Sequence, residues 1–94
     1  MDAIGILKSH EQRIRREYGV RTIGIFGSFA RGEEREGSDV DILVDFNEGA
    51  KTFDRFMDLK FFLEDLFGRK VDLVTMAALR PQLKEEILKE VTYA

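Results

Sequence analysis

The fold of this chain depends on two neighbouring stretches, GSFARG at residues 27–32 and GSDVDILVD at residues 37–45. The first follows the apolar and β-branched run 20–26, which predicts a strand. A strand followed by a Gly-Ser turn and a short helix is typical of an anion-binding site, because the N–H groups and the dipole at the start of a helix attract negative charge. We therefore expect Gly27 and Ser28 to hold a phosphate group, with an ordinary serine-capped turn as the alternative.

The second stretch predicts a strand over residues 39–46 that carries acidic residues on one face. Asp39 and Asp41 are two residues apart, so their side chains share a face. Adjacent carboxylates repel each other, and a bound divalent cation removes that cost. Oxygen ligands without cysteine or a nearby histidine favour Mg²⁺ or Mn²⁺ over zinc. An edge strand whose acids face water is the alternative. The opposite face is apolar and predicts core; it consists of Val40, Ile42, Val44 and Phe46.

Together these residues resemble the G-S-x-A-R-G … S-D-x-D-L-x-V signature of the DNA-polymerase-β-like nucleotidyltransferases. The short chain is similar to the minimal prokaryotic members, many of which are antitoxins paired with HEPN-domain toxins. The resemblance implies transfer of a nucleoside monophosphate, with ATP as the expected donor and two Mg²⁺ ions as cofactors. It also implies a third carboxylate on a later strand, and Asp72 in the predicted strand 70–75 is the matching position. Arg31 is a candidate phosphate contact, with a surface salt bridge as the alternative.

Composition limits the class of protein. The chain has 94 residues, of which 44% are hydrophobic, and this predicts a single domain over residues 1–94. Its net charge of −3 argues against strong nucleic-acid binding, which normally needs a basic surface. Without cysteine it forms no disulfide. No apolar run approaches the roughly 20 residues of a membrane span, and no secretory signal is visible. We therefore expect a cytoplasmic protein that does not contact membranes.

Three longer helices are expected around the predicted strands. The first covers residues 2–18, with His10 on its solvent side, and the last begins at Pro81. Residues 92–94 predict either a frayed end or a short edge strand. The longest helix covers residues 52–67 and has more apolar residues than one stripe needs. We expect the excess to contact another chain in a homo- or hetero-oligomer, with a wide core-facing helix as the alternative. These residues are Phe53, Phe56, Met57, Leu59, Phe61, Phe62, Leu63, Leu66 and Phe67.

The predicted fold class is α/β, a small mixed twisted sheet of three or four strands with helices packed mainly on one face. The chain is too short to enclose a small acceptor, so a partner protein is the expected acceptor. The resemblance implies that this acceptor is a tyrosine of a HEPN-type toxin. Three alternatives stay open: a non-catalytic module that neutralises its partner by covering it, a small-molecule nucleotidyltransferase, and a nucleotide-binding structural or regulatory subunit.

Overall fold

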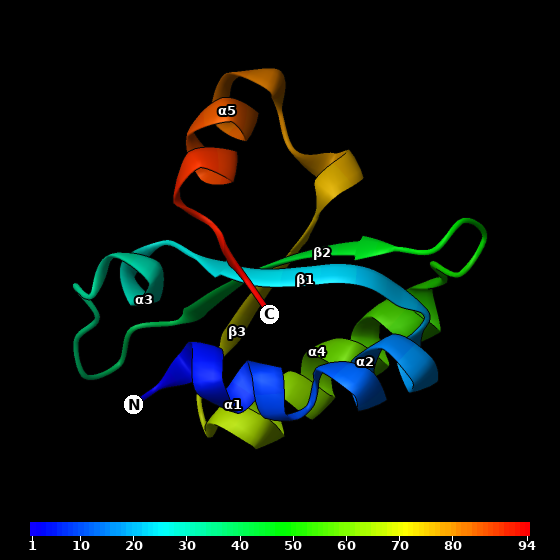
Figure 1. Cartoon of the computed structure of the whole chain (residues 1–94), viewed down its shortest axis with the longest axis horizontal. Helices are drawn as coiled ribbons and strands as arrows, with labels where there is room; N and C mark the ends of the chain where they lie inside the picture. The colour runs from blue at the N-terminus through cyan, green and yellow to red at the C-terminus, as the bar shows by residue number, and fades with distance from the viewer.

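A four-stranded mixed sheet forms the centre of the protein in the computed structural model, which describes all 94 residues (Figure 1). The strand order is β3-β2-β1-β4. The central strands β1 (Val20–Phe26) and β2 (Val40–Phe46) are antiparallel. β3 (Val71–Thr75) lies parallel to β2, and the short β4 (Thr92–Tyr93) lies antiparallel to β1. The predicted mixed sheet is confirmed, and the end of the chain is an edge strand.

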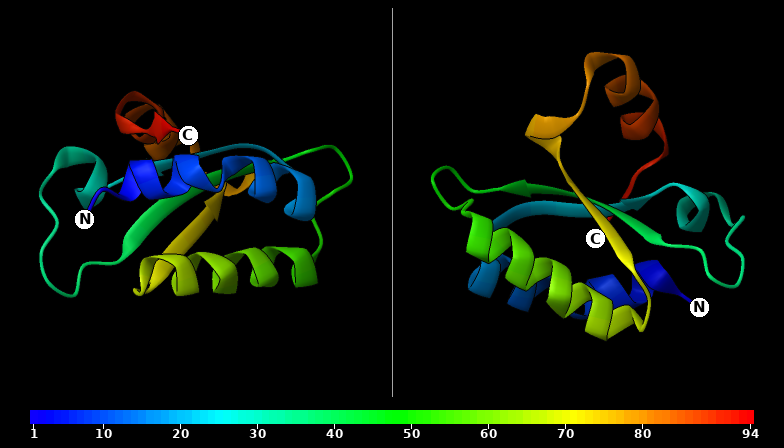
Figure 2. Two further views of the ribbon diagram at one scale, coloured as in Figure 1. Left: turned by 60° about the horizontal axis from the view of Figure 1, so that its bottom comes forward. Right: turned by 180° about the vertical axis from the view of Figure 1, so that it is seen from behind.

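Most of the helical structure covers one face of this sheet, as predicted. Figure 1 and the right view of Figure 2 place α1, α2 and α4 together on one side of the sheet and α5 on the other. α5 has no buried residue, although its first residue is the expected Pro81. No helix has the length and apolarity that crossing a lipid bilayer demands. The helices are α1 (Ala3–Ser9), α2 (Glu11–Tyr18), α3 (Ser28–Arg31), α4 (Phe53–Phe67), the 3-10 helix η1 (Met76–Ala78) and α5 (Pro81–Glu90).

The core lies between the sheet and the three helices α1, α2 and α4. The predicted apolar face of β2 is buried, with Val40, Ile42 and Val44 fully enclosed. Leu59 and Leu63 of α4 belong to the same cluster and are also fully buried. Burial of this apolar face fixes the register of β2, because a slip of one residue would expose it to water. The acidic side chains of β2 therefore project from the opposite face.

The prediction of one continuous helix over residues 2–18 was wrong, since the helix breaks at His10. In a continuous helix the N–H of His10 would bond the carbonyl of Ile6. That carbonyl instead lies 2.9 Å from Nδ1 of the His10 ring, and the His10 N–H bonds the carbonyl of Leu7. The ring is half-buried at 6.2 Å from the Phe62 ring, not on the solvent side. A side chain that takes over a backbone acceptor explains the break.

The expected ends of the longest helix are confirmed. The hydroxyl of Thr52 accepts a hydrogen bond from the Arg55 N–H at 3.1 Å, and Gly68 ends α4 in the left-handed conformation. The apolar side chains of α4 are only partly in the core. Phe53 and Phe61 keep 77% and 54% of their surface exposed, so α4 has more apolar surface than this fold buries.

Candidate active site

Two of the three predicted carboxylates are neighbours across the sheet. Asp41 of β2 and Asp72 of β3 are partners in the parallel register. Both alternate with core residues along their strands, so both project from the face opposite the core. Asp39 lies one residue before β2, on an exposed segment. The two strands therefore bring all three acids to one region of the molecule.

The electrostatics of this region are unfavourable for a free carboxylate. Burial raises the pKa of Asp41 above its ordinary value, and the negative charges of Asp72 and Asp39 raise it further. The positive charge of Arg31 lowers that pKa in part. Asp72 and Asp39 are thus close enough to Asp41 for their negative charges to raise its pKa. A divalent cation would relieve this repulsion, because it would become the largest charge in the site.

The chemistry of these donors suits a hard cation, although they are not closed into a cage. All three are carboxylates, the ligand type that Mg²⁺ and Mn²⁺ prefer. The structure contains no group of three or more His, Cys, Asp or Glu side chains already gathered at metal-binding distance. The acids are neighbours on an open face, so a bound ion and a triphosphate would have to complete the coordination.

The glycine turn is pressed against Asp41. Gly27 has φ 71° and ψ −150°, a conformation that is essentially restricted to glycine. A Cβ added to Gly27 would lie 2.9 Å from Cγ of Asp41 and would overlap Oδ2. Phe26, the last residue of β1, is the register partner of Asp41, which explains the approach. Because Gly27 has no side chain, the turn can lie in direct contact with the Asp41 carboxylate. Ser28, the next residue, is the first residue of α3.

Arg31 is engaged in ion pairs. Its guanidinium contacts Glu90 at 3.0 Å and Glu33 at 3.3 Å, which is the surface salt bridge named above as the alternative interpretation. Glu90 also accepts a hydrogen bond from the Gly27 N–H at 2.7 Å. Sequence reasoning missed Glu90, because it is separated from Gly27 by 63 positions and no local motif relates them.

Arg69 is a second residue that sequence reasoning missed. Its guanidinium donates to the carbonyls of Arg35 and Ser38 at 3.3 and 3.1 Å. The hydroxyl of Ser38 accepts from the Arg35 N–H at 2.8 Å. These bonds define the path of the loop immediately before Asp39. The charged loop between α3 and β2 is thus held by the segment that precedes β3.

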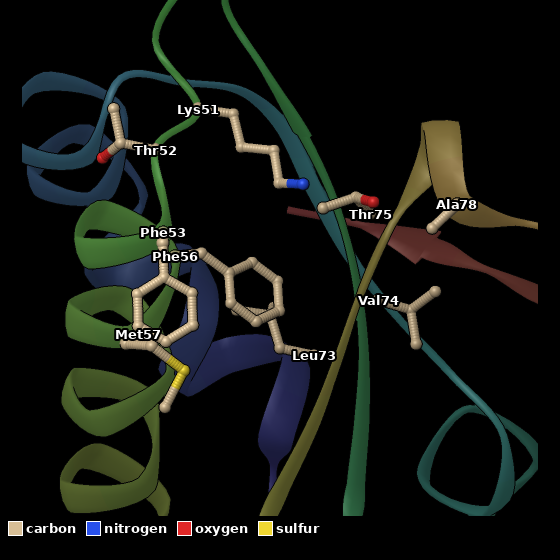
Figure 3. A pocket seen from close by; sticks show the side chains of 9 residues that line it. All are labelled: Lys51, Thr52, Phe53, Phe56, Met57, Leu73, Val74, Thr75 and Ala78. Carbon is tan, nitrogen blue, oxygen red and sulfur yellow. The ribbon is translucent and has the colours of Figure 1, made fainter.

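An apolar groove lies beside the carboxylates rather than over them. Figure 3 shows it between α4 and β3, with a volume of about 470 Å³. None of the six predicted site residues lines it. Val74 does line it, and Val74 lies two residues after Asp72 on the same face of β3. The groove therefore shares strand β3 with Asp72. The other lining residues are Lys51, Thr52, Phe53, Phe56, Met57, Leu73, Thr75 and Ala78.

Paired carboxylates on a sheet next to a glycine turn suit a divalent cation and a phosphate group. Residues 7–94 match the family model of the nucleotidyltransferase domain, and the chain belongs to this family. The predicted enzyme class, a nucleotidyltransferase, is confirmed. Protein adenylyltransferase MntA of Thermococcus cleftensis is 47% identical over 88 residues, covering 94% of this chain and 88% of that protein. A Methanocaldococcus jannaschii protein, provisionally named a protein adenylyltransferase, is 43% identical over 94% of this chain and 90% of its own length.

Solved structures share the fold. A provisionally named minimal nucleotidyltransferase superposes with a TM-score of 0.81 at 39% identity, covering 98% of this chain and 95% of that one. The MNT antitoxin complex with the tri-AMPylated HEPN toxin of Shewanella oneidensis gives a TM-score of 0.67 at 19% identity, covering 99% of this chain and 71% of that one. At that identity the second likeness concerns the fold alone.

Proposed function

We propose that this chain is a protein adenylyltransferase that transfers AMP from ATP to a hydroxyl of a partner protein in the cytoplasm. One observation carries the proposal: sheet register places Asp41 beside Asp72, and the turn at Gly27 closes against the same carboxylate. Nucleotidyl transfer needs this combination, since the reaction is catalysed mainly by positioning phosphates and neutralising their charge.

The reaction is an in-line displacement at the α-phosphorus of ATP. The acceptor oxygen forms a bond to the α-phosphorus, the bond from that phosphorus to the bridging oxygen breaks, and pyrophosphate leaves. Asp39, Asp41 and Asp72 would hold Mg²⁺, which would stabilise the charge on the attacking and leaving oxygens. We assign to the Asp72 carboxylate the removal of the proton from the acceptor hydroxyl.

We assign binding of the triphosphate to the turn at Gly27 and Ser28. In this assignment the N–H and hydroxyl of Ser28 donate hydrogen bonds to the β- and γ-phosphates. Gly27 contributes space rather than a donor, because its own N–H is bonded to Glu90. Arg31 adds positive charge at this corner while it stays paired with Glu90.

We infer that the acceptor is a tyrosine of a HEPN-type toxin and that this chain is its antitoxin. Two findings support this inference: the 47% identical relative is named a protein adenylyltransferase, and chains of the same fold occur in complexes with HEPN toxins. The activity can be tested by incubating the chain and the product of the adjacent reading frame with Mg²⁺ and, in turn, ATP, CTP, GTP or UTP. Intact-protein mass should show adenylyl groups on the partner with ATP alone, and none in EDTA. Neutralisation of the partner without a mass change would instead support non-catalytic masking.

We propose that the partner binds in the groove between α4 and β3, because Phe53 leaves apolar surface exposed at its rim and β3, the strand that carries Asp72, forms its other wall. Phe53→Lys, at the exposed rim of the groove, should weaken binding of the partner about tenfold or more, because it replaces an aromatic contact with a charge. Phe61→Lys is the matched control, since Phe61 is exposed on the same helix but outside the groove. Isothermal titration calorimetry measures both affinities. Equal losses for the two variants would place the partner elsewhere on α4.

A further inference from the structure

We propose that Glu90 is a positioning residue of the active site, which holds the phosphate-binding turn in place from the C-terminal end of the chain. This inference rests on the proposed nucleotidyl transfer at Gly27 and Asp41. It assigns a role in that site to α5, a helix that has no buried residue and whose contact with the turn comes from its last residue.

Three contacts from one carboxylate carry the proposal. Oε1 of Glu90 accepts from the Gly27 N–H at 2.7 Å and lies 3.2 Å from a guanidinium nitrogen of Arg31. Oε2 lies 3.0 Å from the same nitrogen. The Glu90 side chain keeps only 29% of its surface exposed, so these bonds are partly shielded from water. Hydrogen bonds that involve a charged partner are about twice as strong as neutral ones.

The sheet brings Glu90 to this position. β4 pairs with β1 so that Tyr93 lies opposite Gly24 and Thr92 opposite Ile25. Continuing this antiparallel register by two residues puts Glu90 opposite Gly27. The approach depends on Gly24, where a Cβ would lie 2.8 Å from the carbonyl oxygen of Thr92. A glycine inside β1 thus makes room for β4, and β4 brings Glu90 to the turn.

Glu90 and Asp41 contact Gly27 from different sides. The Cα of Gly27 faces the Asp41 carboxylate, and its N–H is bonded to Glu90. Glycine has the greatest backbone freedom of any residue, so an unattached turn would sample other conformations. Displacing a reacting group by about 1 Å can cost 10²-fold in rate. The contact therefore keeps Ser28 at a constant distance from the carboxylates, and it also orients Arg31.

Two substitutions separate the hydrogen bond from the charge. Glu90→Ala removes both, whereas Glu90→Gln keeps an oxygen acceptor for the Gly27 N–H and removes only the charge that pairs with Arg31. Glu86→Ala is the matched control, because Glu86 is an exposed acid on the same helix whose side chain makes no salt bridge or hydrogen bond. The readouts are amide hydrogen exchange at Gly27 by NMR, Tm, and kcat and KM for Mg-ATP in partner adenylylation.

In Glu90→Ala, exchange at Gly27 should accelerate, and kcat/KM for Mg-ATP should fall by about 10- to 100-fold. Glu90→Gln should keep the slow exchange and recover part of kcat/KM, and Glu86→Ala should match the wild type in every readout. A Glu90→Ala variant with unchanged exchange and unchanged kcat/KM would overturn the proposal. A lower KM would also overturn it, since Glu90 would then be a competitor of the triphosphate.

The exchange measurement also separates this proposal from the proposed function. If the wild type transfers no nucleotide, the proposed function fails. Faster exchange at Gly27 in Glu90→Ala, with slow exchange in Glu90→Gln, would then still establish that Glu90 holds the turn. Equal exchange and equal loss of Tm in the two Glu90 variants would reduce Glu90 to a structural residue and overturn the positioning role.

Discussion

Asp41→Asn should abolish adenylyl transfer and, at neutral pH, make the protein more stable. Asparagine keeps the shape of the side chain but removes the charge that would hold Mg²⁺, which supplies several kcal/mol of catalysis. We expect a loss in kcat/KM of at least about 10³-fold. Transfer is measured by intact mass of the partner, and binding of the ion by the rise of the wild-type Tm in Mg²⁺, which the variant should not show.

The gain in stability follows from the raised pKa of Asp41. The folded state binds the Asp41 proton more tightly than the unfolded chain, whose carboxyl has the ordinary value of 3.8. The resulting stabilisation is complete below the unfolded pKa and is lost as pH rises through the folded pKa. At pH 7 the ionised carboxylate is therefore a cost that asparagine removes. Because the side chain is half-exposed, we expect a rise in Tm of only about 2–4 °C, which should shrink as the pH is lowered toward 4.

Asp45→Asn is the matched control for this experiment. Asp45 is on the same strand and the same face as Asp41, but its partner is Arg21, at 3.7 Å. This variant should keep transfer and keep the Tm response to Mg²⁺. If Asp41→Asn retained activity, or if Asp45→Asn lost as much, the assignment of the metal-binding carboxylates would be wrong.

Gly27→Ala should remove both activity and a large part of the stability. The added Cβ would overlap the Asp41 carboxylate, and the backbone conformation at φ 71° and ψ −150° is strained for any residue with a side chain. Strain of about 1–3 kcal/mol and steric overlap of similar size should lower the Tm by at least about 10 °C. Transfer should fall to background at temperatures where the variant is still folded. Thermal unfolding followed by circular dichroism, together with the partner mass assay, checks both results.

Gly32→Ala separates backbone strain from the overlap with Asp41. Gly32 has φ 70°, and a Cβ at that position meets nothing within 4 Å. This variant should lose only about 1 kcal/mol and should keep most of its activity. If Gly32→Ala and Gly27→Ala lost equal stability and activity, the contact between the turn and Asp41 would have no special role.

Local sequence patterns determined much of this protein. The alternation of Val40 with Asp41 along β2 decided which face is core and which is acidic, because side chains alternate in a strand. The predicted helix over residues 52–67 matches α4, because its caps, Thr52 and Gly68, act within a few residues. The Gly-Ser turn followed from the same kind of short-range signal. The pairing of Asp72 with Asp41 was expected only from the family resemblance, since periodicity cannot relate two strands.

The tertiary structure decided what depends on contacts between distant residues. The break at His10 follows from its ring bonding the Ile6 carbonyl, which a helical periodicity does not reveal. Arg31 has its ion pair, and Gly27 its hydrogen bond, because a two-residue strand at the end of the chain brings Glu90 to them. A strand that short has no measurable periodicity, and its register exists only when β1 is already in the sheet. Sequence thus determined most of the elements and the acidic face, and the pairing of the sheet decided which residues meet at the site.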